Sequence, residues 1–135
     1  MSEGIRELDR LVRSMNPELH AETYVFVNIP QKPCQMRMEE IQGCYRESEG
    51  MTFILDKETA DRKGLTYSNT WRSITLRIHS DLEAVGFTAK ISGALALAGI
   101  PCNMIAACYH DHIYVPALLA DKAMNVLVDL QETKI

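Results

Sequence analysis

The segment Ile74–Pro116 constrains the fold more than any other part of the chain, because its residues predict a definite order of elements. The run Ile74–His79 alternates apolar and polar residues, which predicts a strand with one buried face. Gly86 precedes a set of apolar residues at helical spacing, and Gly99 ends that pattern. We therefore expect a strand, a polar loop and a helix in this order. The apolar residues of the helix are Phe87, Ile91, Ala94, Leu95 and Ala98.

The residues after this helix predict a hairpin. Ile100 is placed for the hydrophobic contact that accompanies a Schellman ending. Cys102–Ala107 has the composition of a second strand, Tyr109–His112 of a turn and Ile113–Val115 of a third strand. This order brings a polar loop and a helix N-terminus next to a sheet edge, where a small zwitterion could bind.

The first half of the chain repeats this pattern in part. Tyr24–Ile29 corresponds to the first strand, and Thr52–Leu55 followed by Asp56–Lys63 corresponds to the last strand and helix. The short connection Pro30–Gln42 stands where the second half has a full helix, and its prolines disfavour helix at its start. A helical stripe in Ile5–Val12 predicts a leading helix, which we expect to cover the sheet face left open. The predicted order is α-β-β-β-α followed by β-α-β-β-α.

Composition limits the kinds of partner. The chain has 135 residues and a net charge of −4, which argues against a nucleic-acid surface. No apolar run approaches the roughly 20 residues that span a bilayer, and the charged start Ser2–Arg6 is unlike a signal peptide. We therefore expect a cytoplasmic protein without a membrane partner. The cysteines form no CxxC pair and are expected to be free, mostly buried thiols. They are Cys34, Cys44, Cys102 and Cys108.

The run Gly86–Ile100 resembles the first helix of an ACT domain, the small regulatory domain that senses amino acids in metabolic enzymes. The runs His79–Gly86 and Tyr109–Pro116 are similar to those of short bacterial proteins of uncharacterised function that are built from two ACT-like units. The pair Asp111-His112 before the last strand also resembles, more distantly, the cytosolic arginine sensors of animals, which carry tandem ACT units. The resemblance is specific over Trp71–Leu130 and weaker over Gly4–Leu65.

This resemblance implies an α+β fold. The expectation is two tandem ACT-like (ferredoxin-like) units, with a mainly antiparallel sheet and helices on one face. Residues 1–68 would form an atypical N-terminal unit with a leading helix, and residues 69–135 a C-terminal unit of order βαββα. The chain departs from the family at one place: the usual loop is a short Asp-x-x-Gly, whereas several extra residues precede Gly86 here, so the family's ligand contacts need not carry over.

The loop and the start of the helix form the predicted ligand site. Free amides of the first turn, Gly86–Ala89, attract a carboxylate, and Asp81 and Glu83 can hold an ammonium or guanidinium group. Acidic residues before a helix are also common without any ligand; the family resemblance favours the ligand site. The predicted ligand contacts are Ser80, Asp81, Leu82, Glu83, Ala84, Val85, Gly86, Phe87, Asn103, His110 and Asp111.

Two features leave alternatives open. The histidines of Tyr109–His112, with His79 and Cys108, could form a zinc site, but their spacing lacks a paired motif and a polar hairpin turn is favoured. We predict no metal, and we expect Asp111 to face the loop, where it could hold a cationic group. Asn103 could bond a ligand carboxylate or cap a nearby turn, and both readings stand.

No pattern in the chain predicts catalysis. Ser80 lacks a glycine-framed elbow, Cys34 and Cys44 lack a histidine partner pattern, and no glycine-rich phosphate loop is present. We therefore expect no catalytic residue, no cofactor and no enzyme activity. The expected function is that of a small-molecule sensor that binds an amino acid or a similar zwitterion. The alternative is an oligomerisation or interaction module that docks on an enzyme or transporter without a ligand of its own.

We also expect assembly. The strands Tyr24–Ile29 and Ile74–Ile78 carry few charges, and an exposed sheet edge without charges promotes association. We therefore expect a homodimer or a higher symmetric oligomer, with the loop Ser80–Phe87 at or near an interface between ACT-like units.

Overall fold

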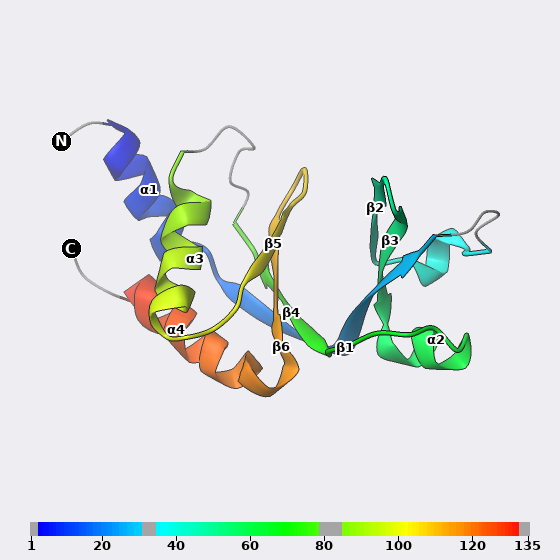
Figure 1. The fold of residues 1–135 in the computed structure, drawn as a ribbon. Helices are drawn as coiled ribbons and strands as arrows, with labels where there is room; N and C mark the ends of the chain where they lie inside the picture. The colour runs from blue at the N-terminus through cyan, green and yellow to red at the C-terminus, as the bar shows by residue number, and fades with distance from the viewer. Residues whose placement is uncertain (1–2, 31–34, 79–84, 133–135) are drawn as a thin grey trace. The chain divides into compact units, whose positions relative to one another are not determined.

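The computed structural model describes residues 3–30, 35–78 and 85–132. Its contacts divide the chain into two compact units, whose elements are labelled in Figure 1. Unit 1 consists of Met1–His20 and Arg72–Ile135, and unit 2 consists of Ala21–Trp71. Both units combine hydrogen-bonded strands with helices, so the expected α+β class and the expected element order are confirmed.

Unit 1 is the larger of the two. Hydrogen-bonded neighbours in its sheet follow the order β1-β4-β6-β5, and its helices α1, α3 and α4 contact one another. Strand β1 begins in unit 1 and continues into unit 2. The elements that contribute to unit 1 are α1 (Glu3–Arg13), β1 (Pro17–Ile29), β4 (Trp71–Leu76), α3 (Phe87–Leu97), β5 (Asn103–Ala106), β6 (Asp111–Pro116), a 3-10 turn (Ala117–Leu119) and α4 (Ala120–Glu132).

The core of unit 1 lies between the helices and one face of this sheet. Leu76 of β4 and Val115 of β6 are fully buried in it, and so is Ile91 of α3. Because side chains alternate along a strand, Thr75 and His112 lie on the opposite face. The buried core comprises Leu11, Val12, Met15, Ile74, Leu76, Phe87, Ile91, Leu95, Ile100, Ile113, Val115, Ala120, Ala123 and Leu127.

Helix α3 forms and ends as its sequence predicts. Gly99 adopts a left-handed conformation with φ 75°, and its N–H donates to the Ala96 carbonyl at 2.9 Å. The Ile100 N–H donates to the Leu95 carbonyl at 2.9 Å. These two bonds form the expected Schellman ending, and Ile100 is buried in the core beside it.

Helix α1 does not occupy the place that its sequence position suggested. We expected it to cover the sheet of the first repeat, but it contacts α3 and α4 of unit 1. Its residues Leu11 and Val12, followed by Met15, are buried in the core of unit 1. The expectation was wrong because an apolar stripe packs on whichever apolar surface is available, and here α3 and α4 present that surface. Residues before Ala21 pack with the second half of the chain. The domain boundary between residues 68 and 69 therefore stays a proposal that rests on the sequence repeats.

Strand β4 is an interior strand, which corrects the expected open edge at Ile74–Ile78, whereas the open edge expected at Tyr24–Ile29, on the side away from β3, stays a prediction. Strand β1 pairs with β3 along Tyr24–Ile29, and β4 lies between β1 and β6. The strands at the ends of the order are β2 and β5. β1 also begins earlier than predicted, at Pro17, because its first residues are mostly polar and gave little apolar signal.

Unit 2 is built on a three-strand ladder of order β2-β3-β1. A two-residue turn joins β2 to β3, with Glu47 opposite Gly50. Its core contains Phe53 and Leu55 of β3 and Ala60 of α2. The further elements are a 3-10 turn (Met38–Glu40), β2 (Gly43–Glu47), β3 (Gly50–Asp56) and α2 (Lys57–Arg62).

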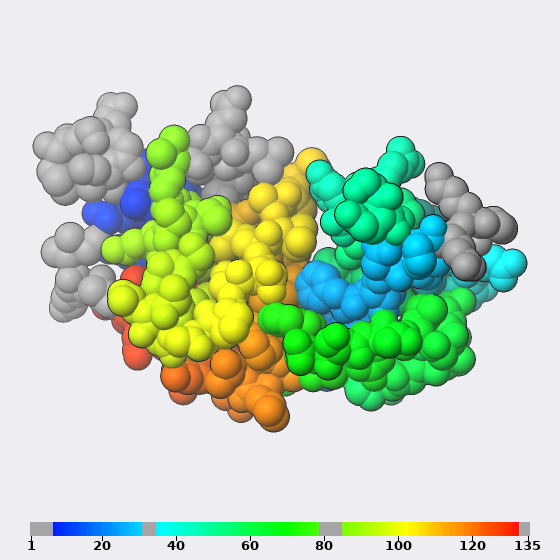
Figure 2. Space-filling view, in the orientation of Figure 1, coloured from blue at the N-terminus to red at the C-terminus, as the bar shows by residue number. Residues whose placement is uncertain are grey.

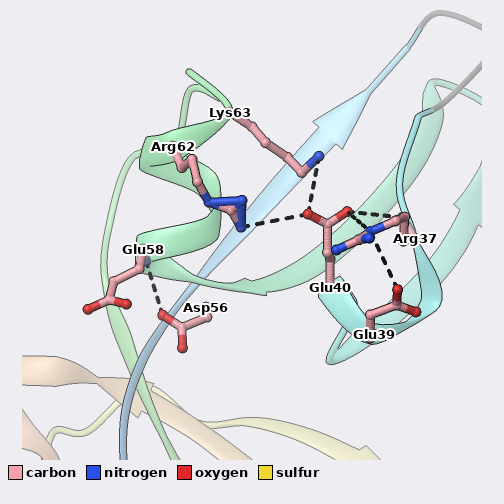
Figure 3. A network of polar contacts seen from close by, with 7 residues as sticks. All are labelled: Arg37, Glu39, Glu40, Asp56, Glu58, Arg62 and Lys63. Carbon is pink, nitrogen blue, oxygen red and sulfur yellow. Dashed lines mark hydrogen bonds and ion pairs between the residues drawn. The ribbon is translucent and has the colours of Figure 1, made fainter.

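A charge cluster joins the 3-10 turn of unit 2 to the end of α2, as Figure 3 shows. The Glu40 carboxylate accepts a hydrogen bond from the Arg37 backbone N–H at 3.1 Å. Lys63 Nζ lies 3.3 Å and an Arg62 guanidinium nitrogen 3.7 Å from the same carboxylate. The Arg37 backbone N–H, and next the Lys63 ammonium, lower the pKa of Glu40 from its ordinary value. The cluster thus ties a turn with little regular structure to a helix.

Candidate functional site

The N-terminus of α3 is the centre of the predicted ligand site. Gly86 is its N-cap and adopts a left-handed conformation with φ 89°, which a residue with a side chain rarely adopts. Its carbonyl accepts the N–H of Lys90 at 2.9 Å, and as a glycine it offers no side chain to cap the first turn. The amides that open the helix are therefore not capped by the N-cap residue itself.

The residues next to Gly86 have different environments. Val85 is 88% exposed, whereas Phe87 is buried in the core of unit 1. The Phe87 side chain therefore serves packing, and only its backbone is placed to meet a ligand. Helix α1 approaches Gly86 through Leu8, a neighbour that the sequence analysis did not assign to the site. The predicted contacts Ser80, Asp81, Leu82, Glu83 and Ala84 lie outside the described residues.

The β5–β6 hairpin carries the other predicted contacts. The Ala107 N–H donates to the His110 carbonyl at 3.1 Å and closes its turn. His110 is half-buried, and Asp111, opposite Ala106, is buried at the start of β6. By strand alternation Asp111 lies on the same face as Ile113, which is the face that the helices cover.

Asn103 lies apart from Asp111. It is exposed and stands opposite Tyr114, three residues along β6 from Asp111. Strand geometry separates them by roughly 10 Å and places them on opposite faces of the hairpin. The structure therefore does not bring these two predicted contacts together.

The sequence analysis missed a polar cluster on the face opposite the helices. Thr75 stands between His20 of β1 and His112 of β6, and its hydroxyl is within hydrogen-bond distance of both rings. Burial, followed by the nearby rings of His110 and His20, lowers the pKa of His112 from its ordinary value. Only the pairing of three strands that are distant in sequence reveals this cluster.

The described residues give little support for a metal site or for a reactive cysteine. Within residues 3–30, 35–78 and 85–132, no group of three or more histidine, cysteine or acidic side chains is placed to hold a metal ion. The zinc alternative would also need His79, which lies outside those ranges. Burial raises the pKa of the half-buried Cys102 thiol, which disfavours a reactive thiolate. Cys44 and Cys108 are exposed, which differs from the buried thiols expected, and Cys34 lies outside the described residues.

Comparison with known proteins decides the family. The ACT-domain family model matches residues 3–72, and a second ACT-domain model matches residues 67–129. The chain belongs to the ACT-domain family. It carries two ACT domains in tandem, and the ACT domain is a regulatory rather than a catalytic domain.

Solved structures agree with this assignment. A Vibrio cholerae protein of unknown function, described as a possible transport protein, is 40% identical with a TM-score of 0.86, over 96% of this chain and all of that one. The regulatory subunit of aspartate kinase from Thermus flavus shares the fold at 14% identity and a TM-score of 0.60, over 86% of this chain and 97% of that subunit. An Agrobacterium tumefaciens protein shares it at 11% identity and a TM-score of 0.70, over 85% and 87% of the two chains. Among curated protein sequences, none matches this tandem ACT-domain chain.

The helices of this ACT-domain chain are short. Over the part of the chain that the structure describes, none is both long and apolar enough to cross a membrane.

Proposed function

We propose that this tandem ACT-domain protein is a non-enzymatic sensor that binds an amino acid, or a similar small zwitterion, at the N-terminus of α3. The observation that carries the proposal is Gly86, a left-handed glycine that opens α3 without a side-chain cap in a chain of a regulatory family. A glycine at this position lets a ligand approach the backbone closely.

The chemistry of the site suits a zwitterion. Amides of the first turn of α3 would bind the carboxylate, and the dipole of the helix favours a negative charge there. Asp81 and Glu83 precede this turn in sequence and would hold the ammonium group. Three acidic residues, these two and Asp111, make a cationic amino acid the preferred ligand.

The comparisons support a regulatory role and leave the ligand open. Similar folds serve as the regulatory subunit of aspartate kinase in Thermus flavus and Thermus thermophilus. The Vibrio relative, described as a possible transport protein, suggests a transporter as another partner. We propose that the chain regulates an enzyme or a transporter.

The affinity expected of such a site is moderate. A ligand of about ten heavy atoms at about 0.6 kcal/mol per atom gives a binding free energy near −6 kcal/mol, or tens of micromolar. Ligand at about 100 times its dissociation constant adds about 2.7 kcal/mol of stability. A thermal-shift screen of the twenty amino acids at millimolar concentration should therefore detect it.

Paired variants locate the site. Asp81→Asn/Glu83→Gln should abolish the thermal shift from the ligand found in the screen. The matched control is Glu47→Gln/Glu49→Gln, which removes two charges at the same spacing in the β2–β3 turn and should retain the shift. No shift from any amino acid in the parent protein, or equal shifts in both variants, would contradict the proposed site.

A second candidate function is a docking module without a ligand. An apolar groove on unit 1 favours it, because Leu97 at its rim is 93% exposed. Figure 2 shows the yellow-green surface of α3 open to solvent on this face. The groove is also lined by Gly93 and Ala96 of α3, whose side chains are absent or small, and by Leu130 of α4. Capture of one enzyme or transport component from native extract, unchanged by any amino acid, would favour docking; capture that depends on an amino acid would favour sensing.

Assembly is part of both candidates. We propose that the chain forms a homodimer or a higher homo-oligomer, with the loop Ser80–Phe87 near an interface between ACT domains. Light scattering at tens of micromolar, with and without ligand, tests this. A monomer under both conditions would rule it out.

A further inference from the structure

Three side chains of unit 1 form a hydrogen-bond chain across its sheet. His20 Nε2 lies 2.7 Å from the Thr75 hydroxyl, and His112 Nδ1 lies 2.9 Å from the same hydroxyl. The three residues come from β1, β4 and β6, which are neighbours in the sheet. We call this set the His–Thr–His chain. It makes one threonine oxygen the link between two imidazole rings.

The His–Thr–His chain lies where the polypeptide passes between the two units. His20 is the last residue of unit 1 on β1, and Arg72 is its first residue on β4. The Arg72 guanidinium donates two hydrogen bonds to the His20 carbonyl, at 3.0 and 2.7 Å. Arg77, the residue that follows β4, forms an ion pair with Glu18 of β1. The first residues of β1 are thus fastened to unit 1 by side chains as well as by backbone.

The number of hydrogens on the three side chains limits the protonation states in which every polar atom of the His–Thr–His chain has a partner. A threonine hydroxyl donates one hydrogen and accepts two. With both rings neutral, one ring N–H donates to Thr75 and the hydroxyl donates to the other ring. With one ring protonated, that ring becomes the donor and both bonds survive. With both rings protonated, each ring nitrogen carries a hydrogen, and the hydroxyl hydrogen loses its acceptor.

The loss of an acceptor for the Thr75 hydroxyl hydrogen is costly because this hydroxyl is buried. Thr75 is only 2% exposed, so water cannot readily replace the missing acceptor. Two imidazolium rings bonded to one oxygen would also repel each other. The His–Thr–His chain therefore tolerates one proton and is weakened by a second, which leaves the hydroxyl hydrogen without an acceptor and places two cations on one oxygen.

The charged neighbours of His112 do not offset the cost of protonating its ring. His110 lies at 6.3 Å from His112, measured between ring centroids, and Arg77 adds positive charge. Asp111 favours the protonated form of His112, but less than burial and the cationic neighbours oppose it. Glu18 is engaged by Arg77, and Glu22 follows His20 by two residues on β1. On β5, Ile105 stands opposite His112 and brings no charge.

We propose that the His–Thr–His chain is an acid-sensitive tie that holds the first residues of β1 in the sheet of unit 1. Near neutral pH the tie is closed. As the pH falls below the ordinary pKa of histidine, a second proton weakens the tie and with it the hold of unit 1 on the first residues of β1. This inference does not depend on the proposed amino-acid ligand.

Nuclear magnetic resonance of the full chain tests the proposal. The ring signals of His20 and His112, followed from near pH 8 to pH 5, should titrate as a coupled pair in two separate steps. Amide hydrogen exchange, corrected for its intrinsic pH dependence, should show roughly tenfold loss of protection for residues 18–20 at pH 5. Amides of β3 in unit 2 should lose much less.

Matched variants separate the tie from general destabilisation. Thr75→Val removes the hydroxyl and keeps the shape, so the two histidines should titrate independently and the acid-induced loss of protection should shrink. Ser73→Ala is the control, because it removes another buried hydroxyl two residues away on the same face of β4. It should leave the acid response as in the parent protein.

A second variant keeps the test decisive if Thr75→Val does not fold. In His112→Gln the side-chain amide can still bond the Thr75 hydroxyl but cannot titrate. Protection near pH 7.5 should be retained, and its loss at pH 5 should disappear. Independent titration of His20 and His112 in the parent protein would overturn the proposal. So would an acid response of residues 18–20 that is unchanged in both Thr75→Val and His112→Gln.

Discussion

The Leu8 side chain lies 3.4 Å from the position that a Cβ atom on Gly86 would occupy. This separation is an ordinary van der Waals contact, so α1 leaves room for a methyl group beside the start of α3. The requirement for glycine therefore comes from the backbone, whose φ of 89° lies in the left-handed region.

Replacing Gly86 should destabilise the protein through this backbone strain. We expect Gly86→Ala to lower the free energy of unfolding by about 1–2 kcal/mol. Gly93→Ala is the matched control: Gly93 lies inside α3 with nothing within 4 Å of an added Cβ, so alanine should raise the free energy by about 0.5–1 kcal/mol. Urea unfolding measures both. A higher free energy of unfolding in both variants would show that alanine adopts the backbone conformation at position 86 without strain.

Two leucines on α3 should respond oppositely to truncation. Leu95 is fully buried in the core of unit 1, whereas Leu97 is 93% exposed. Leu95→Ala should lower the free energy of unfolding by about 2–5 kcal/mol, because it leaves a cavity. Leu97→Ala should change it by less than about 0.5 kcal/mol in the isolated chain. A large loss from Leu97→Ala would indicate that an assembled form buries this residue, and chemical unfolding at several protein concentrations would identify it.

The Glu40 cluster should stabilise unit 2 in a pH-dependent way. The folded-state pKa of Glu40 lies below its ordinary value of 4.5, so its contribution is fully present above that value and is lost as the pH falls through the folded pKa. Glu40→Gln should therefore be less stable than the parent near neutral pH, and the two should converge below about pH 4.5.

Unfolding of both proteins from pH 7 to pH 3 at constant ionic strength checks this. Glu39→Gln is the control, since Glu39 makes a single exposed ion pair with Arg37 and should change stability little at any pH. A difference between the parent and Glu40→Gln that does not vary with pH would contradict the ionic role of Glu40.

Asp56 should stabilise α2 as its N-cap. Its Oδ1 accepts the backbone N–H of Glu58 at 3.0 Å. Asp56→Ala should lower the free energy of unfolding by about 1 kcal/mol, because that N–H loses its partner. Asp56→Asn keeps a carbonyl acceptor and should lower it much less. Equal losses in the two variants would assign the effect to charge rather than to capping.

Elements defined by local patterns could be predicted from the sequence. The helix that opens at Gly86 and its Schellman ending at Ile100 both depend on residues close together in the chain. The first residues of β1 escaped prediction because polar side chains such as Glu18 and His20 predominate there. A strand that keeps one face polar gives little hydrophobic signal.

Features that depend on distant pairing could not be predicted. The position of α1 against α3 and α4 follows from competition between apolar surfaces, which one sequence does not rank. Asn103 and Asp111 looked like parts of one site, but the register of their hairpin places them on opposite faces. The link between His20 and His112 through Thr75 arises from three strands that are neighbours in the sheet although other elements separate them in the sequence.

The division of β1 between two units sets an order of folding during synthesis. Residues 21–71 form a continuous stretch, so unit 2 has all its strands once that stretch has left the ribosome. Helix α1 and the first residues of β1 emerge before residues 21–71, whereas their partners in β4, α3 and α4 emerge after them. The apolar stripe of α1 therefore remains without its native partners while residues 21–71 are synthesised.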